Sequence, residues 1–258
     1  MSTLMEKLIT DARPAPPKLL VYGEPGVGKT TFAAGSGCTL VDCENGAGNI
    51  PGLKRTQYLK NWNEIHNWLV ELIRNADKAG PVAIDTIDWM IHRITEHVII
   101  DLEPSKANDI TNTIGSSHGG YYKARDIVIN IVSRELLPAL NELTARGCPV
   151  ILLAHASNVK ITTPEGFDQR LAGPDLPHWI APLFIEWADG VLYAHRDFKK
   201  DRVLRTTGNN LITAKNRYSM PEILPLDWGA VVQAIARNFQ LHTADNPQHR
   251  HGARRVGG

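Results

Sequence analysis

The segment from Lys18 to Thr31 most constrains how this chain can fold. It reads KLLVYGEPGVGKTT, in which a short apolar run leads into a stretch, Gly23–Thr30, that satisfies the phosphate-binding pattern G-x-x-x-x-G-K-[ST] in full. A loop of this kind joins a buried strand to a helix, so we expect an α/β fold with a mostly parallel sheet flanked by helices. The alternative is an accidental Gly-rich turn, and the strand before the loop and the small residues after it argue against that.

The residue types of this loop suit a nucleoside triphosphate. Its glycines let the backbone turn tightly and bring N–H groups close to phosphate oxygens. Lys29 can reach the β- and γ-phosphates, and the Thr30 hydroxyl can ligate the Mg²⁺ that bridges them. We therefore expect ATP and Mg²⁺ as cofactors. The residues predicted to bind the nucleotide are Gly23, Glu24, Pro25, Gly26, Val27, Gly28, Lys29, Thr30 and Thr31.

Two acidic strand ends are expected beside the loop. The apolar run PVAI ends in Asp85, the pattern of a carboxylate that holds Mg²⁺ together with Thr30. Thr86 follows where an AAA-plus motor usually has a glutamate, which argues against that class and requires a base elsewhere. Glu44, after the apolar strand TLVDC, is the candidate for activating water, and Asp88 is the competing acid. Asp88 could instead cap the next helix.

A further strand end and two polar segments extend this prediction. The run PVILLA leads into His155, which would sit in line with the γ-phosphate and could sense it, or could be an ordinary structural histidine. Residues 103–120 and 158–178 are predicted to be long loops, and loops of this length inside a compact domain are usually functional or disordered. A long helix is expected over 121–146 between them.

The C-terminal part is predicted to contain a β-hairpin. Residues 202–207 and 210–215 flank Gly208-Asn209, which is a strong turn signal. The hairpin runs into Lys215 and Arg217, which we expect to act between subunits, because a cation supplied from a neighbour can neutralise charge on the transferring phosphoryl group. The alternative is a pair of solvated charges at a strand end.

Composition limits the remaining possibilities. The 258 residues are 43% hydrophobic and 21% charged with a formal net charge of +1, so there is no global basic field and any nucleic-acid binding must come from local segments. The three cysteines have no metal-ligand spacing, which indicates buried, reduced thiols. No signal core or membrane-length apolar run is present, so we expect a cytoplasmic protein with no membrane partner. The predicted organisation is an extension over 1–17, an ATPase domain over 18–240 and a disordered basic tail over 241–258.

Taken in order, these motifs resemble the RecA-fold ATPases, which include recombinases and hexameric replicative helicases. VDCENG is similar to their strand carrying the catalytic glutamate, TIGSSHGG to a first DNA-binding loop, and AKNR to a motif that reaches the neighbour's ATP. ILLAH departs from the family pattern, because His155 stands where Gln is usual. Within this superfamily the chain looks like the small phage-encoded RecA-like ATP-binding proteins, some of which act as single-strand annealing recombinases.

The resemblance implies a RecA-like P-loop NTPase core, and a Mg²⁺-dependent ATPase that is stimulated by DNA and completed between subunits of a ring or filament. The implied partners are single-stranded DNA, further copies of the chain, and a single-strand-binding protein. The implied catalytic residues are Glu44, Lys29, His155, Lys215 and Arg217. Contacts with the strand would come from Lys106, His118, Lys123, Lys160 and Arg170.

Two other functions fit the phosphate-binding loop. A small-molecule kinase would need a lid with clustered arginines, but residues 158–178 contain only Arg170. An ATP-gated clamp or packaging accessory would bind ATP tightly and hydrolyse it slowly. A GTPase is disfavoured, because no Asn/Thr-Lys-x-Asp motif follows a late strand.

Overall fold

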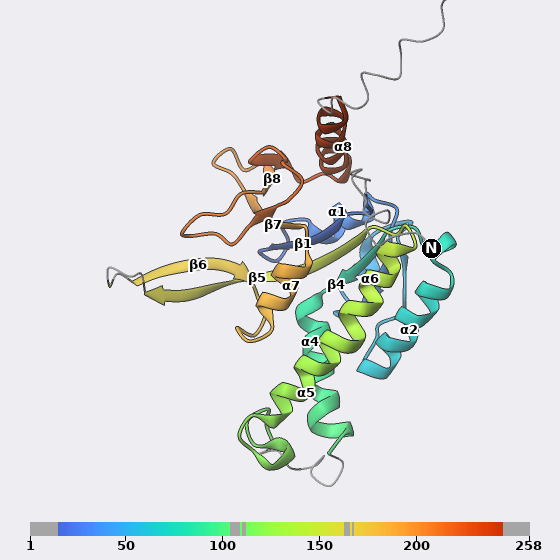
Figure 1. Ribbon diagram of the computed structural model, residues 1–258, viewed down its shortest axis with the longest axis vertical. Coiled ribbons are helices and arrows are strands. Elements are labelled where there is room, and N and C mark those ends of the chain that lie inside the picture. Colours follow the sequence, from blue (N-terminus) through green and yellow to red (C-terminus); the bar gives the residue numbers. More distant parts are fainter. Residues whose placement is uncertain (1–14, 104–108, 110–111, 163–165, 167, 245–258) are drawn as a thin grey trace, which may run out of the picture.

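The computed structural model describes residues 15–244, apart from 104–108, 110–111, 163–165 and 167 (Figure 1). One sheet organises this part of the chain, in the order β10-β8-β7-β1-β5-β4-β2-β3, with β6 paired to β5 and β9 to β7. The strands are β1 (Lys18–Gly23), β2 (Thr39–Asp42), β3 (Lys54–Arg55), β4 (Val82–Asp85), β5 (Val150–Thr162), β6 (Asp168–Pro174), β7 (Gly190–Arg196), β8 (Arg202–Arg205), β9 (Lys215–Asn216) and β10 (Ile223–Pro225). The α-helices are α1 (Lys29–Ala34), α2 (Trp62–Arg74), α3 (Ala76–Ala79), α4 (Ile87–Glu96), α5 (Lys123–Ile131), α6 (Leu137–Ala145), α7 (Ala181–Trp187) and α8 (Trp228–Ala244).

The central strands β7, β1, β5, β4 and β2 are all parallel, which confirms the predicted fold class. Their near-continuous apolar sequences are typical of strands that are covered on both faces. β5 lies between the strand that precedes the phosphate-binding loop and the strand that ends in Asp85, with Gly23 opposite His155 in the register. Because parallel strands end at the same edge, this order brings the predicted site residues together.

Helices cover both faces of the sheet. Alternate residues of β1 point to opposite sides: Leu20 and Tyr22 are buried in the core beneath α2, α4, α5, α6 and α7, whereas Leu19 and Val21 are buried beneath α1 and α8. Figure 1 shows the same two layers. The strict alternation fixes the register of β1, since a shift by one residue would exchange the two cores.

The predicted helix over 121–146 is confirmed, although it is not a uniform α-helix. It consists of α5, a π-helical turn η6 (Val132–Leu136), and α6. Pro138 lies in the first turn of α6, and its missing N–H and its ring disturb the preceding turn. Together with α4 and the π-turn η3 (His97–Asp101), these helices form an arm that extends away from the sheet (Figure 1).

The predicted loop over 158–178 is wrong. β5 continues to Thr162 and pairs antiparallel with β6, and the resulting hairpin projects from the body of the molecule (Figure 1). The segment NVKIT is rich in β-branched residues, which favour strands. The many Gly and Pro residues nearby concealed this strand pattern in the sequence.

The predicted hairpin between 202–207 and 210–215 is also wrong. β8 pairs antiparallel with β7 and with β10, so the C-terminal hairpin is formed by β7 and β8. Its turn is organised by Asp197, whose Oδ1 accepts hydrogen bonds from the backbone N–H groups of Lys199 and Asp201. Residues 211–213 instead hydrogen-bond to Ala172 of β6, which removes them from β8.

Several smaller expectations can be compared with the structure. All three cysteines (Cys38, Cys43 and Cys148) are buried and free, as predicted. Asp227 caps α8 by accepting a hydrogen bond from the backbone N–H of Ala230, as predicted. Among the described residues, no helix is long and apolar enough to cross a membrane. Residues 241–244 of the predicted basic tail continue α8, whereas residues 245–258, Lys106 and most of the N-terminal extension lie outside the described residues.

Candidate nucleotide-binding site

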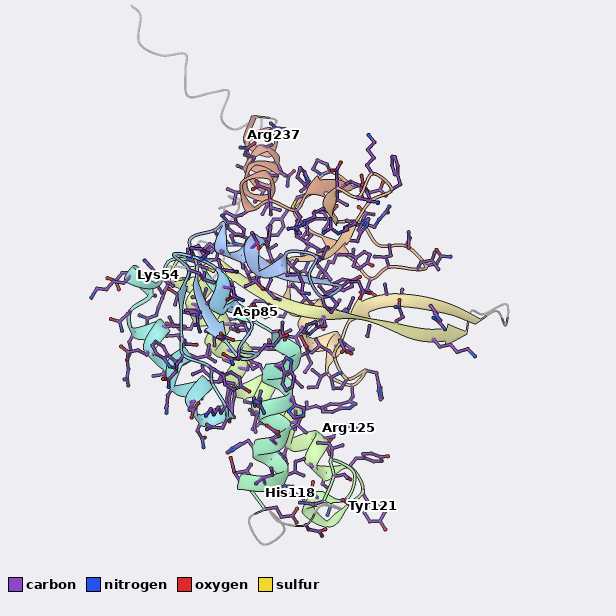
Figure 2. All side chains as sticks on the ribbon, turned by 180° about the vertical axis from the view of Figure 1, so that it is seen from behind. Lys54, Asp85, His118, Tyr121, Arg125 and Arg237 are labelled. Carbon is purple, nitrogen blue, oxygen red and sulfur yellow. The ribbon has the colours of Figure 1, made fainter. Side chains whose placement is uncertain are left out.

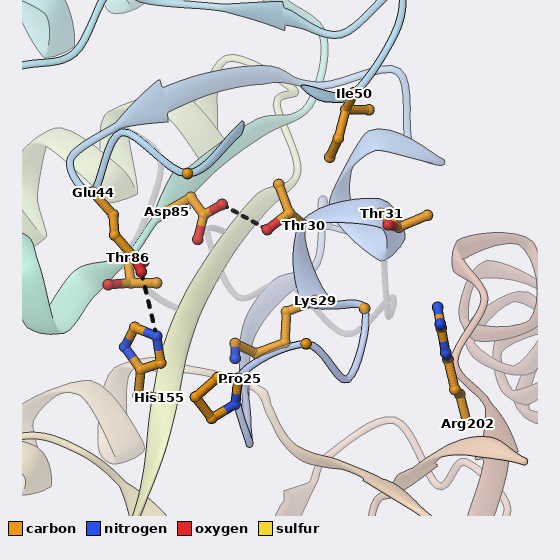
Figure 3. Close-up of a pocket in the computed structure, with 13 residues that line it drawn as sticks. Pro25, Lys29, Thr30, Thr31, Glu44, Ile50, Asp85, Thr86, His155 and Arg202 are labelled. Atoms are coloured by element: carbon orange, nitrogen blue, oxygen red, sulfur yellow. Dashed lines mark hydrogen bonds and ion pairs between the residues drawn. The ribbon is translucent and has the colours of Figure 1, made fainter. Parts of the chain in front are cut away.

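A cavity of about 360 Å³ opens at the carboxyl edge of the parallel strands (Figure 3). This volume lies in the range of pockets that bind small molecules. The structure thus brings the phosphate-binding loop, Glu44, Asp85 and His155 together in one place. The lining residues are Pro25, Gly26, Gly28, Lys29, Thr30, Thr31, Glu44, Gly46, Ile50, Asp85, Thr86, His155 and Arg202.

The phosphate-binding loop has the backbone that its glycines allow. Gly26 and Gly28 have φ values of +73° and +111°, a region that residues with a side chain rarely adopt. The Lys29 ammonium folds back over the loop, where it donates hydrogen bonds to the carbonyl oxygens of Gly23 (2.8 Å) and Glu24 (3.2 Å). Burial lowers the pKa of Lys29, and the carboxylates of the site partly oppose this shift. Phosphate oxygens would supply the partners that this buried ammonium needs.

The side chains of Thr30 and Asp85 fit the requirements of Mg²⁺. The Thr30 hydroxyl donates a 2.8 Å hydrogen bond to Asp85 Oδ2, so both oxygens already lie next to each other. Burial raises the pKa of Asp85 to about 6, and the hydrogen bond from Thr30 partly offsets that effect. The hydroxyl of Thr86, which also lines the cavity, is buried and has no hydrogen-bond partner among the described residues. Mg²⁺ usually takes one or two protein oxygens together with phosphate and water, and this donor set suits it.

The described residues contain no cluster of three His, Cys, Asp or Glu side chains that could hold a metal ion. A metal in this cavity would therefore depend on oxygens from a bound nucleotide and from water.

His155 connects two acidic side chains. Asp88 accepts hydrogen bonds from His155 Nδ1 (2.7 Å) and from the backbone N–H of His155 (3.2 Å). The other ring nitrogen, Nε2, faces Glu44 Oε1 at 3.5 Å (Figure 3). A hydrogen bond from one ring nitrogen to a carboxylate, such as the one from Nδ1 to Asp88, fixes the tautomer and the orientation of an imidazole. Asp88 is therefore committed to His155, and the residue at the N-cap of α4 is Thr86, which corrects the expectation that Asp88 caps this helix.

Glu44 is held at the cavity by the turn that follows β2. The buried Asp42 accepts hydrogen bonds from the backbone N–H groups of Glu44 (3.3 Å) and Asn45 (2.6 Å). Arg55 pairs with the same carboxylate at 3.3 Å. The Glu44 side chain remains partly exposed toward the cavity, so it can contact both water and a ligand.

Arg202 is a residue of this site that the sequence motifs did not indicate. It begins β8, and a Cβ built on Gly28 would lie 3.0 Å from its Nη1 atom, so the guanidinium group lies against the loop backbone. In Figure 3 the Arg202 side chain approaches from the Thr31 side of α1, away from Glu44 and His155. It forms no ion pair with any described residue. Only the antiparallel return of β8 along β7 brings it here, and no local signal in the sequence predicts that.

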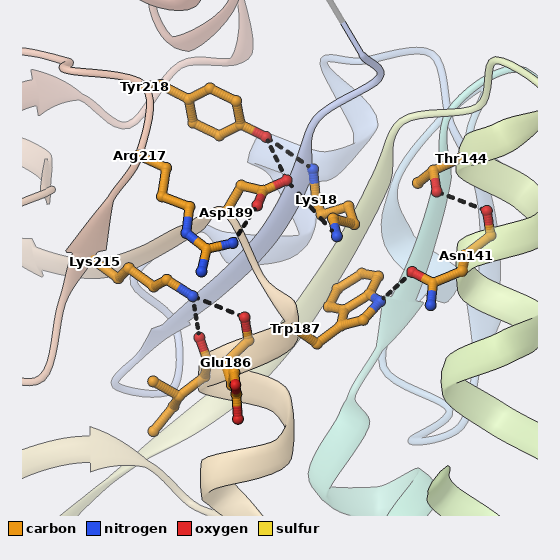
Figure 4. Close-up of polar contacts among 10 residues, drawn as sticks. Lys18, Asn141, Thr144, Glu186, Trp187, Asp189, Lys215, Arg217 and Tyr218 are labelled. Atoms are coloured by element: carbon orange, nitrogen blue, oxygen red, sulfur yellow. Dashed lines mark hydrogen bonds and ion pairs between the residues drawn. The ribbon is translucent and has the colours of Figure 1, made fainter. Parts of the chain in front are cut away.

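Lys215 and Arg217 do not line the cavity. Lys215 donates hydrogen bonds to the carbonyl oxygens of Ile185 (2.9 Å) and Glu186 (2.8 Å) at the end of α7, and Arg217 pairs with Asp189 at 3.0 Å (Figure 4). Burial, with a smaller contribution from Arg217, lowers the pKa of Lys215. Asp189 hydrogen-bonds through its backbone to Lys18 at the start of β1, so these cations lie at the amino edge of the parallel strands. Within one chain they are therefore at the opposite edge from the nucleotide cavity.

The residues predicted to contact DNA do not form one patch. Lys123 is exposed at the start of α5, and Lys160 and Arg170 are exposed partners across the β5–β6 hairpin. His118 is half-buried, and its Nε2 lies 2.8 Å from the carbonyl oxygen of Val98. Its ring is therefore engaged in a contact within the arm. Figure 2 shows His118 at the end of the arm that lies away from Asp85. The two groups of cations are thus on separate projections of the molecule.

Comparison with protein families decides the class of this core. A family model described as AAA domain matches residues 15–218, which is most of the chain. The chain belongs to this family. The match confirms a P-loop ATPase, and it corrects the argument that Thr86 after Asp85 excludes an AAA-type protein. Comparison with curated protein sequences gave no match. The likeness to phage recombinases therefore stays a prediction.

Proposed function

We propose that this AAA-domain protein hydrolyses Mg²⁺-ATP and acts on single-stranded DNA in recombination, annealing or replication. The observation that carries the proposal is the convergence of Thr30–Asp85 and Glu44–His155–Asp88 on the cavity above the phosphate-binding loop. Hydrolysis requires a phosphate cradle, a cation site and a base facing the γ-phosphate. The cavity contains a candidate for each of them.

The chemistry follows from the positions of these side chains. Lys29 and the loop N–H groups would hold the β- and γ-phosphates, and Thr30 and Asp85 would hold Mg²⁺, which neutralises phosphate charge when it is bound. The Glu44 carboxylate would accept a proton as water attacks the γ-phosphorus and the bond to the β-phosphate oxygen breaks. His155 lies beside Glu44 and would report the presence of the γ-phosphate.

Two arginines are proposed to act at different ends of the nucleotide. Arg202 lies near Thr31, on the side of the loop away from the proposed base, and would therefore contact the α-phosphate or ribose. Arg217 lies at the far edge of the sheet and could reach only the nucleotide of another subunit. The proposal assigns binding to Arg202 and charge stabilisation in a ring or filament to Lys215 and Arg217.

Single-stranded DNA is the proposed partner because exposed cations occur on both projections, and on the arm an exposed aromatic side chain lies beside them. Tyr121 is 93% exposed beside Lys123 at the end of the arm, and Lys160 and Arg170 face each other on the hairpin. Exposed aromatic rings can stack on bases while cations contact the backbone phosphates. The modest net charge agrees with local contacts of this kind.

The experiment that tests this proposal is binding of a labelled single-stranded oligonucleotide at increasing salt, with a duplex of the same length as the control. We expect tighter binding of the single strand and an affinity that falls as salt increases, because phosphate contacts release counterions. Equal binding of both forms would reject a preference for single-stranded DNA, and no salt-sensitive binding at all would reject DNA as the partner. ATP hydrolysis without any response to DNA would leave the ATPase assignment intact but not this one.

A further inference from the structure

A second cavity, of about 520 Å³, lies on the other side of His155 from the nucleotide cavity. Its lining is mainly apolar, with the indole rings of Trp89 and Trp179 and the side chain of Ile114. Asp88 and His155 belong to both the lining of this cavity and the hydrogen-bonded group beside Glu44. A ligand in this second cavity would therefore contact His155, which also lines the nucleotide cavity, and Asp88, which is bonded to it.

The second cavity is assembled from segments that are distant in the sequence. Trp89 comes from α4, Ile114 from the segment before α5, and Asp175 and Trp179 from the segment after β6. The backbone N–H of Asp175 donates a 2.8 Å hydrogen bond to the carbonyl oxygen of His155, so this wall is fixed directly to the end of the central strand. The segment before α5 includes Ile114 of TIGSSHGG, the stretch that is similar to a first DNA-binding loop.

The chemistry of the walls suits a flat aromatic ligand. Both indoles are only partly buried, and each has an arginine over one of its rings: Arg93 lies 5.2 Å from Trp89, and Arg125 lies 5.3 Å from Trp179. Arg125 also lies 4.4 Å from the ring of the exposed Tyr122, which places a cation beside aromatic rings. The Asp175 carboxylate is exposed and has no side-chain partner among the described residues, so it can accept hydrogen bonds from an amino group. Stacking surfaces with a cation and an acceptor are what a nucleobase in a single strand requires.

We propose that the second cavity binds one unstacked base of the single strand, between Trp89 and Trp179, with Asp175 accepting from its exocyclic amino group. The inference rests on the proposed function and deepens it by assigning the site at which the strand reaches the ATPase centre. Because His155 lines both cavities and Asp88 fixes its orientation, occupation of one cavity changes the affinity of the other. Thermodynamic linkage requires that this coupling is equal in both directions.

Two oligonucleotides separate base binding from backbone binding. One is an ordinary single strand, and the other has the same length and charge but consists of abasic sites. The full chain, with a non-hydrolysable ATP analogue, should bind the ordinary strand about tenfold or more tightly than the abasic strand, as expected for base stacking on aromatic side chains. If wild type binds neither strand, the proposed function fails with the inference. If it binds both equally in a salt-sensitive manner, the proposed function stands and this inference is rejected.

Trp179→Ala tests the site itself. We expect about a tenfold loss of affinity for the ordinary strand and no change for the abasic strand, with ATP hydrolysis in the absence of DNA unchanged. Trp179→Phe should retain most of the affinity, because it keeps a stacking surface. Trp68→Ala, which removes a partly exposed indole from α2, is the matched control and should change nothing. Unchanged binding of both strands by a folded Trp179→Ala protein would overturn the proposal.

Asp175→Asn provides a second test that does not remove packing, because this side chain is exposed. Wild type should prefer oligo(dC), whose bases carry an amino group, over oligo(dT), whose bases do not. The variant should lose several-fold of this preference, because the amide is a weaker acceptor than the carboxylate. An identical preference in wild type and variant would exclude Asp175 from base recognition and contradict the proposed orientation.

Discussion

The two cavities that share His155 differ in how they are built. The polar cavity gathers most of its acidic and basic groups from the ends of adjacent buried strands, and hydrogen bonds of 2.6–2.8 Å and an ion pair of 3.5 Å hold these groups. The second cavity is bounded by Trp89, Ile114 and Trp179, from one helix and two connecting segments. Rigid strand ends therefore hold the proposed reacting groups in fixed positions, whereas connecting segments form a surface that can change shape when a partner binds. Among the described residues, only His155 and Asp88 both line the second cavity and belong to the polar group that includes Glu44.

The largest expected effect tests whether the polar cavity is complete within one chain. Arg217→Ala should lower the rate of ATP hydrolysis by about 10³-fold or more at concentrations where the protein assembles, because a cation supplied in trans stabilises the transferring phosphoryl group. The measurement is the hydrolysis rate as a function of protein concentration. Asp189→Asn is the matched control, since it removes the ion-pair partner but keeps the arginine. Equal losses in both variants would show that the pair is only structural, and an unchanged rate in Arg217→Ala would reject the trans role.

The next effect isolates chemistry from binding in the polar cavity. Glu44→Gln should lower kcat by about 10²–10³-fold and leave ATP affinity nearly unchanged, because the amide cannot accept the proton of the attacking water. Single-turnover hydrolysis and equilibrium binding of ATP would measure the two quantities. Glu142→Gln, on the exposed surface of α6, is the control. A fall in affinity that matches the fall in rate would mean that Glu44 binds ATP and is not the base.

A smaller effect separates the two ends of the nucleotide. Arg202→Ala should raise the Kd for both ATP and ADP by about 10–100-fold, the range expected for loss of a charge-assisted hydrogen bond, with little change in kcat. Arg205→Ala is the control on the same strand, because Arg205 pairs with Glu222 at 2.6 Å outside the cavity. If ATP binding weakens much more than ADP binding, Arg202 contacts the γ-phosphate and the assignment to the α-phosphate side is wrong.

The smallest effect concerns stability. The pKa of Asp85 is raised from 3.8 to about 6, so its charged form is disfavoured in the folded state and the protein loses stability as pH rises from about 4 through 6. Asp85→Asn removes that cost while keeping an acceptor for Thr30. At pH 8 the nucleotide-free variant should be more stable by about 1–3 kcal/mol, or about 2–4 °C in Tm for each kcal/mol.

Thermal unfolding at pH 8 and pH 5 measures this difference. The gain should be smaller at pH 5, where part of the wild-type Asp85 population is already protonated. Adding Mg²⁺-ATP should stabilise wild type and have little effect on the variant, because the variant lacks the carboxylate that would hold the cation. A gain of equal size at both pH values would contradict the raised pKa.

The sequence predicted the polar cavity because its residues follow apolar strands. Gly23, Glu44, Asp85 and His155 each come at or just after the end of such a run, and parallel strands end at one edge. The contribution of Arg202 could not be predicted in this way, because it depends on β8 folding back along β7. The β5–β6 hairpin was missed because Gly and Pro residues outweighed a short β-branched pattern.

The second cavity could not be predicted from the sequence for a different reason. Trp89 and Trp179 are ninety positions apart in the numbering, and each one alone fits an ordinary partly buried indole. Their proximity depends on how α4 and the segment after β6 pack against β5. The sequence also misled about the protein class. Thr86 after Asp85 argued against an AAA-type protein, whereas the AAA domain model matches residues 15–218. One residue type at one position does not decide the class of a protein when a family model matches most of the chain.

The most direct test of the account is the coupling between the two cavities. In the Glu44→Gln protein, where ATP persists, the Kd of ATP would be measured with and without saturating single-stranded DNA, and the Kd of the DNA with and without saturating ATP. We predict that each ligand tightens the other by the same factor, about 5–150-fold, and that Asp88→Ala in the same background reduces this factor to about one. No coupling in the Glu44→Gln protein, or coupling that persists unchanged without Asp88, would contradict the claim that the His155–Asp88 pair connects the two cavities.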